Sequence, residues 1–166
     1  YASHVVGGEI TYRKQFGNTY QFQLVVYINF AECAFNTENC PDIPDLDILG
    51  APGTLQAGQK LGCIDLAKSS IRDITPVCRT VASACTATPG INAGVEAWIY
   101  SGTFDFTALM SVQCKLHIAV RIDARTDAWG TAEYFYNNAA LDLCNHLSNN
   151  SPQLTAPAFY LLAEHE

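Results

Sequence analysis

Alternation of apolar and polar side chains is the strongest pattern in this chain. In residues 21–30, QFQLVVYINF, one face carries apolar side chains and the other carries mostly polar ones. The apolar face consists of Phe22, Leu24, Val26, Ile28 and Phe30, and the other face includes Gln21, Gln23, Tyr27 and Asn29. Because successive side chains of a strand point to opposite sides of its sheet, this segment predicts a strand with one buried face.

The first residues show the same period. In HVVGGEITYR, residues 4–13, Ile10 and Tyr12 alternate with the polar residues 9, 11 and 13. The turn residues FGN, 16–18, separate this segment from the next one, so the two strands are predicted to form a hairpin. Chain ends are usually frayed unless something holds them, so a strand at this position needs a partner.

Short strands with turn residues between them continue along the chain. Further strands are predicted at Leu46–Leu49, Gly62–Leu66, Val95–Tyr100, Thr103–Phe106, Cys114–Asp123, Thr131–Asn137 and Ala158–Ala163. A helical period is absent except for a short candidate at Ala139–Leu147. Many short strands separated by Gly and Pro predict an all-β fold, an antiparallel β-sandwich of the immunoglobulin-like or jelly-roll-like kind, in one domain over residues 1–166.

Composition and charge narrow the classes of function. The 166 residues are 49% hydrophobic and 15% charged, which predicts a packed domain rather than a disordered chain. The net charge is −7 and the nine Lys and Arg are scattered, so nucleic acid is not an expected partner. The apolar runs are shorter than the roughly 18 residues of a membrane helix, so no transmembrane segment is expected.

Seven cysteines favour an oxidising compartment. Their spacing predicts three disulfides, Cys33 with Cys40, Cys78 with Cys85, and Cys114 with Cys144. Cys63 is left over, as a free thiol, a bond to another chain or the sign of a different pairing. We favour disulfides over zinc because the chain has no Cys-x-x-Cys. The chain also begins at Tyr1 without Met, so we expect a mature secreted, extracellular protein.

Motifs for catalysis are missing from the sequence. It has no Gly-x-Ser-x-Gly, no phosphate loop and no His-Glu-x-x-His. The four histidines, His4, His117, His146 and His165, are interpreted as structural or surface residues. We therefore expect no enzyme activity.

Two ligand hypotheses remain open. Asp42, Asp45 and Asp47 lie in one predicted loop and could offer oxygens to Ca²⁺, although solvated loop acids explain them as well. The motifs WIYSG, DAWG and YFYNN combine aromatic residues with polar ones, and Trp98 and Trp129 could stack on a sugar. Aromatic residues in strands usually serve the core, so the metal and sugar hypotheses rank behind a structural role, with no cofactor expected otherwise.

Several segments together resemble a known family. They are SHVVGGEITYR, GNTYQFQLVVYINFAEC, GVEAWIYSGTFDF and CNHLSNNSPQLTAPAFYL, and they span nearly the whole chain. They are similar to the N-terminal domain of large secreted surface proteins of Bacteroidota, described as gliding-motility-associated or adhesin-like and exported by type IX secretion. The chain departs from the family where Val120-Arg121-Ile122-Asp123 replaces an adjacent Cys-Cys-Arg-Asn, so part of the family disulfide pattern is missing.

The resemblance implies a non-catalytic role at the cell surface. We expect a structural or adhesive protein that binds copies of itself or other surface proteins, with a filament built by exchange of terminal strands as the specific form. The assembly residues are predicted to be Val5, Val6, Ile10 and Tyr12 in the first strand and Phe159, Tyr160, Leu161 and Leu162 in the last. The alternative is a carbohydrate-binding module, with glycans as partners and calcium as a possible ligand.

Overall fold

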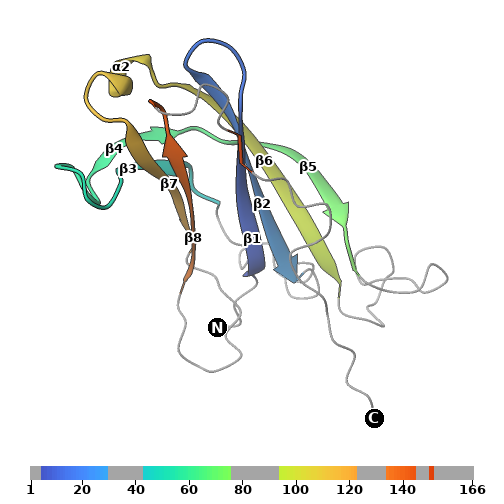
Figure 1. Cartoon of the computed structure of the whole chain (residues 1–166). Coiled ribbons are helices and arrows are strands. Elements are labelled where there is room, and N and C mark those ends of the chain that lie inside the picture. The colour runs from blue at the N-terminus through green and yellow to red at the C-terminus, as the bar shows by residue number, and fades with distance from the viewer. Residues whose placement is uncertain (1–4, 30–42, 76–93, 123–133, 145–149, 152–166) are drawn as a thin grey trace.

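Two antiparallel sheets of four strands pack face to face, which confirms the all-β sandwich (Figure 1). The computed structural model describes residues 5–29, 43–75, 94–122, 134–144 and 150–151. The first sheet has the order β1 (Val5–Lys14), β2 (Thr19–Asn29), β6 (Val95–Asp105) and β5 (Ala67–Asp73). The second has the order β4 (Lys60–Ile64), β3 (Leu46–Gly50), β7 (Lys115–Ile122) and β8 (Phe135–Asp142).

The predicted hairpin at the start of the chain is confirmed. Strands β1 and β2 pair antiparallel along nearly their whole length, with Tyr12 opposite Phe22. Gly17 in the turn has a φ of 53°, a left-handed conformation that glycine adopts without steric cost. The first strand therefore has a neighbour in its own chain.

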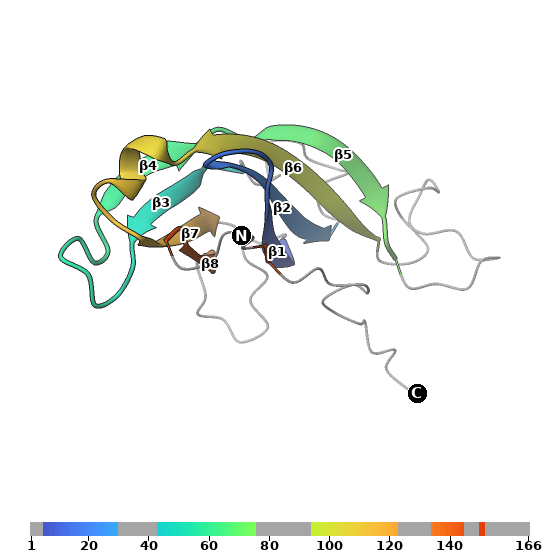
Figure 2. The same ribbon diagram turned by 45° about the horizontal axis from the view of Figure 1, so that its top comes forward.

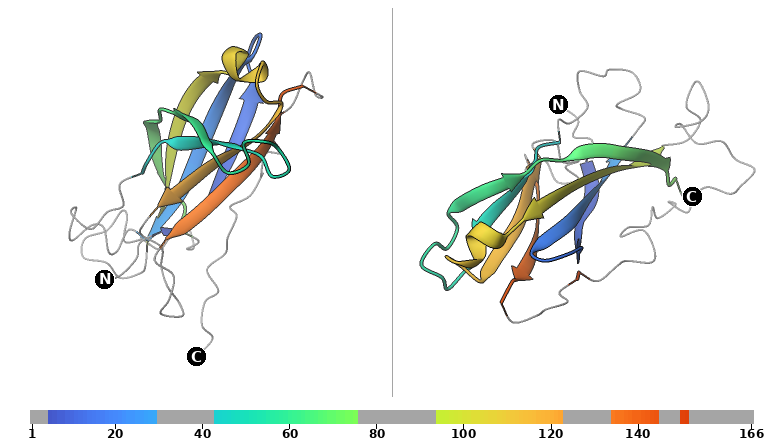
Figure 3. Two further views of the ribbon diagram at one scale, coloured as in Figure 1. Left: turned by 90° about the vertical axis from the view of Figure 1, so that its left-hand side faces the viewer. Right: turned by 90° about the horizontal axis from the view of Figure 1, so that it is seen from above.

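The core lies between the two sheets. The predicted inner face of β2, Phe22, Leu24, Val26 and Ile28, is fully buried, and residues of β3, β7 and β8 face it from the second sheet. Burying a side chain of this size stabilises the fold by about 1.5–3 kcal/mol. When the molecule is turned by 90°, β7 and β8 lie in front of β1 and β2, as these contacts require (Figure 3).

The outer face of β2 differs from the prediction. We expected this strand to have one buried face, but Tyr27 on the opposite face is only 4% exposed. Tyr27 and Val25 belong to a second apolar cluster with Val95, Ala97 and Ile99 of β6. The second half of β2 is therefore buried on both faces, because its neighbour β6 places apolar residues beside it.

Strand β6 is longer than expected. The sequence predicts two strands with a break near Ser101 and Gly102, but one continuous strand runs from Val95 to Asp105. A Cβ on Gly102 would overlap the backbone oxygen of Asp65 and lie 3.1 Å from Ile64 Cγ2. The glycine thus permits a close approach of the chain between β4 and β5, and does not mark a turn.

The structure differs from the sequence-based prediction at three other places. The helix predicted at Ala139–Leu147 is wrong over its described part, because β8 extends to Asp142 and pairs with β7 there. Strand β5 was not predicted, since its polar residues show no apolar alternation. A short helix, α2 (Thr107–Met110), follows β6 and was not predicted either. The strands predicted at 46–49, 62–66 and 114–123 correspond to β3, β4 and β7, while the one at 158–163 lies outside the described residues.

The Cys114–Cys144 disulfide is confirmed. It joins the residue before β7 to the turn after β8, with a Cα–Cα distance of 5.3 Å. Cys33, Cys40, Cys78 and Cys85 lie outside the described residues, and Cys63 is a free, exposed thiol on β4. Among the described residues, the helices are too short or too polar to cross a membrane.

Candidate interaction site on the open edge of strand β1

Among the strands that the structure describes, β1 is the outermost of the first sheet and pairs with β2 alone. In an antiparallel pair, the backbone groups of successive residues point alternately toward and away from the partner strand. Tyr12 turns its N–H and C=O away from β2, toward Ser151. By the same alternation, Gly8 and Ile10 present their backbone groups on this outer edge.

Residues 150 and 151 occupy one end of the edge, where they lie against β1 (Figure 1). The Ser151 N–H donates to the Tyr12 oxygen at 3.0 Å, and the Tyr12 N–H donates to Ser151 Oγ at 2.7 Å. The Lys14 N–H donates to Asn150 Oδ1 at 2.8 Å. Two short polar side chains thus substitute for backbone acceptors of a neighbouring strand.

The middle of the edge, at Ile10, has no hydrogen-bonded partner among the described residues. Within the part of the chain that the structure describes, no hydrogen bond reaches the edge-facing N–H or C=O of Ile10. The next edge-facing oxygen, that of Gly8, accepts a hydrogen bond from Asn137 Nδ2 at 3.0 Å. A strand placed along β1 would therefore find donors and acceptors between Tyr12 and Gly8.

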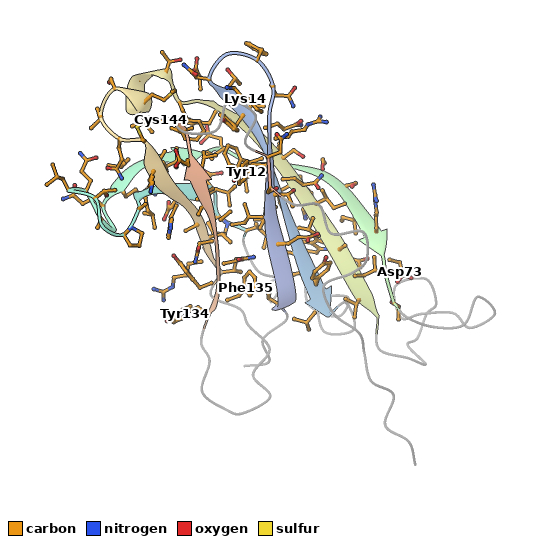
Figure 4. The ribbon with its side chains drawn as sticks, in the orientation of Figure 1. Tyr12, Lys14, Asp73, Tyr134, Phe135 and Cys144 are labelled. Atoms are coloured by element: carbon orange, nitrogen blue, oxygen red, sulfur yellow. A yellow bond between two sulfur atoms is a disulfide. The ribbon has the colours of Figure 1, made fainter. Side chains whose placement is uncertain are left out.

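Strand β8 of the second sheet packs against β1. Tyr12 and Phe135 both lie in the region between β1 and β8 (Figure 4). The Tyr12 hydroxyl donates to the Ala140 oxygen at 2.9 Å, and a Cβ on Gly8 would lie 3.1 Å from the Phe135 ring. Ile10 and Tyr12 are also buried in the core, so packing of their side chains holds this edge against the second sheet.

The opposite edge of the first sheet carries features that prevent pairing. Strand β5 shows a register shift between Lys68 and Ser70, and its charged residues Lys68, Arg72 and Asp73 are exposed. Its far end also lies well away from the second sheet (Figure 2). Bulges and charges are the usual protection of edge strands. Strand β1 also carries charged residues, Glu9, Arg13 and Lys14, and its register shift lies near its start, between Val5 and Gly7.

The predicted assembly residues of β1 differ in how far their side chains are exposed. Val5, Ile10 and Tyr12 have their side chains in the core, and Val6 is partly exposed at the register shift. The side chains of Val5, Ile10 and Tyr12 are therefore not exposed for contact with a partner. Phe159, Tyr160, Leu161 and Leu162 lie outside the described residues.

Trp98, a residue of the predicted sugar surface, is engaged within the chain. Its Nε1 donates to Glu96 Oε2 at 2.7 Å, and Lys68 Nζ lies 3.6 Å from the centre of its ring. The ammonium group covers the indole face that a sugar would need. Trp129 lies outside the described residues. Tyr134 and Tyr136 of the YFYNN motif are exposed, at 47% and 49%, and the Arg121 guanidinium lies 4.4 Å from the centre of the Tyr134 ring.

The predicted calcium ligands also have protein partners. Asp45 Oδ1 accepts the Leu66 N–H at 2.9 Å, and Asp47 forms an ion pair with Lys60 at 2.5 Å. The hydrogen bond and charge of Asp47 raise the pKa of Lys60. Asp42 lies outside the described residues, within which no three His, Cys, Asp or Glu side chains gather as a metal site. His117 is a partly exposed residue of β7, and the other histidines lie outside the described part.

Sequence reasoning missed Asn150 and Ser151. We interpreted SNNSPQ as a turn cluster, since the segment has no apolar alternation. The available signal was chemical: short Ser and Asn side chains readily bond to backbone groups.

Comparison of the chain with protein families, curated proteins and solved structures finds no match. The function is therefore argued from the edge of β1.

Proposed function

We propose that this protein is an extracellular structural or adhesive module whose copies join by exchanging a C-terminal strand. In the joined state, the segment from Asn150 onward pairs with β1 of a neighbouring copy. The observation that carries the proposal is the hydrogen bonding of Ser151 to Tyr12 beside the open Ile10 position. Exchange keeps these contacts and moves them between chains.

The chemistry of the edge suits such an exchange. Backbone hydrogen bonds give affinity in strand addition, and alternate side chains of the added strand give specificity. The segment after Ser151 includes the apolar run AFYLLA, residues 158–163. When the donor and acceptor are different surfaces, each copy can donate to the next, and the contact produces a filament unless it closes into a ring.

The extracellular setting has separate support. A disulfide that joins the ends of two strands persists in oxidising compartments and is rare in the cytosol. The resemblance to secreted surface proteins of Bacteroidota points to the same setting and to a role without catalysis. Both are independent of the hydrogen bonds at the edge.

The test compares the full chain with a chain that ends at Ser151. We expect the full chain to form polymers as its concentration rises, seen by light scattering and negative-stain microscopy. The shortened chain should stay monomeric, with an unchanged circular dichroism spectrum as the control for folding. A full chain that stays monomeric at every concentration, or a shortened chain that still polymerises, would contradict the proposal.

A further inference from the structure

The outer face of the second sheet is exposed along β8. Every second residue of this strand, at positions 136, 138 and 140, is exposed, and so is Tyr134 just before it. The residues between them turn inward, where Asn137 bonds to the Gly8 oxygen and Leu141 is buried in the core. The left part of Figure 3 shows this outer face turned toward the viewer. A ligand can therefore reach β8 over most of its length.

Three polar side chains on this face have no partner within the described part of the chain. They are the Tyr136 hydroxyl, the Asn138 amide and the His117 imidazole, and none of them takes part in a hydrogen bond, ion pair or ring contact there. The outer face of the first sheet differs, because Arg13 Nε donates to Gln21 Oε1 at 2.8 Å. The donors and acceptors beside β8 are thus left for a ligand.

A groove adjoins these side chains near the end of β8. Its volume is about 520 Å³, and its border includes Pro52, Lys115, His117 and Ala140. Sites for small ligands usually have volumes of about 300–1,000 Å³. Ala140 lies opposite His117, and Tyr136 lies four residues away on the same face of β8, at roughly 14 Å. A ligand that fills the groove and also reaches Tyr136 must be elongated.

The charged side chains on this face of β7 and β8 favour a neutral ligand. Lys115 lies opposite Asp142 across the two strands. The Arg121 guanidinium is held 4.4 Å from the centre of the Tyr134 ring. Because charges of opposite sign lie side by side and the arginine is engaged by an aromatic ring, the face attracts neither an anion nor a cation strongly.

We propose that this face binds a neutral, linear, β-linked oligosaccharide, which lies along β8 from Tyr136 to the groove beside His117. One sugar ring stacks its C–H face on the Tyr136 ring, which offers a broad apolar surface. The Asn138 amide and the His117 imidazole exchange hydrogen bonds with sugar hydroxyls, which both donate and accept. The site goes beyond the proposed function, since it lies on the second sheet and leaves the β1 edge untouched.

A protein partner suits this face less well. Protein interfaces rely on large side chains buried in pockets near their centre. The centre of this face carries Asn138, Ala140 and His117, of which two are polar and one is small. Such a surface matches a chain of hydroxyl groups better than the apolar anchors of a protein.

Isothermal titration calorimetry of the full chain, at a concentration where it is monomeric, tests the site. The probes are β-linked hexasaccharides of glucose, mannose, xylose and N-acetylglucosamine, with a β-linked hexamer of mannuronic acid as the charged comparison. We expect at least one neutral hexasaccharide to bind, and Tyr136→Ala to weaken its binding at least tenfold. Tyr136→Phe should bind within threefold of the wild-type chain, because the stacking ring remains.

The matched control is Phe16→Ala, which removes an aromatic side chain that is 75% exposed in the turn between β1 and β2. It should leave sugar binding unchanged, and circular dichroism checks that each variant is folded. Asn138→Ala keeps the aromatic ring and should still weaken binding at least threefold.

Three results would overturn the inference. The first is a panel in which no neutral hexasaccharide binds. The second is binding that Tyr136→Ala and Phe16→Ala reduce equally, or that neither of them reduces. The third is binding of the mannuronic acid hexamer alone, which would show that charge rather than stacking and hydroxyl contacts selects the ligand.

Discussion

At the scale of single residues, two glycines show how closely the chain packs around β6. A Cβ on Gly102 would overlap the Asp65 backbone oxygen, whereas one on Gly62 of β4 would lie 3.5 Å from Ile48 Cδ1, an ordinary contact. We expect Gly102→Ala to lower the free energy of unfolding by about 1–3 kcal/mol, because backbone cannot move aside easily. Gly62→Ala, the matched control, should change it by less than about 0.5 kcal/mol. Urea unfolding measures both, and equal effects would contradict the argument.

Asp105 gives the fold a defined dependence on pH. Its carboxylate accepts hydrogen bonds from the Thr107 N–H at 2.8 Å and the Thr107 hydroxyl at 2.6 Å, and these lower its pKa below the usual 3.8. Because the folded pKa is the lower one, the stabilisation is present above the unfolded pKa and is lost as the pH falls through the folded pKa.

Removing the hydroxyl tests this account. In Thr107→Val we expect the pKa of Asp105 to move up toward 3.8, measured by NMR titration. The wild-type chain should be more stable than the variant at neutral pH, and the difference should shrink as the pH falls below about 4. A difference that stays constant across this range would exclude the carboxylate as its cause.

At the scale of elements, the sequence predicted strands correctly where one face of the strand is buried, because such burial leaves apolar residues at every second position. Strands β1 and β2 show that period because sheet packing selects apolar residues at alternate positions, with Ile10 and Tyr12 in one strand and Phe22 and Leu24 in the other. Strand β5 has no such period, because its side chains are largely exposed and its backbone pairing to β6 holds it in place. Sequence alone cannot show a strand that is held mainly by its neighbour.

The other errors have the same origin in distant contacts. Gly102 resembles a turn residue until the chain at Asp65 is seen beside it. Ala139, taken as helical, belongs to β8 because Ile118 of β7 lies opposite it. The sequence predicted that a terminal strand adds to an exposed edge of a neighbouring copy, and this stays a prediction, whereas the described hydrogen bonds place Ser151 beside Tyr12 of β1. That placement depends on a contact between residues 139 positions apart, which no local pattern encodes.

The disulfide couples β7 to β8 and offers a test at this scale. The two cysteines are 30 positions apart, so the bond removes loop-closure entropy from the unfolded chain worth about 3–4 kcal/mol. Replacing Cys114 and Cys144 by Ser should lower the free energy of unfolding by about this amount, measured in urea without reductant. Cys63→Ser, at an exposed free thiol, is the control and should have almost no effect. A loss of similar size in the control would show that the bond is not the cause.

At the scale of the whole molecule, the net charge of −7 acts against association of copies. Strand exchange relies on backbone hydrogen bonds and apolar contacts, which salt does not weaken, while repulsion between like-charged molecules is screened over a Debye length of about 8 Å at physiological ionic strength. A chain with an isoelectric point of about 4.9 also loses its net charge as the pH falls toward that value. Charge should therefore control the rate and extent of assembly, although it does not provide the contact.

We accordingly expect polymerisation of the full chain to increase with added NaCl at neutral pH, and to increase again at low salt as the pH approaches 4.9. Light scattering at fixed protein concentration measures both. The chain that ends at Ser151 is the control, because it carries most of the same charge without the exchanged segment. If that chain responds to salt in the same way, the association is nonspecific. Polymers that dissolve on adding salt would show that ion pairs, and not the β1 edge, hold the copies together.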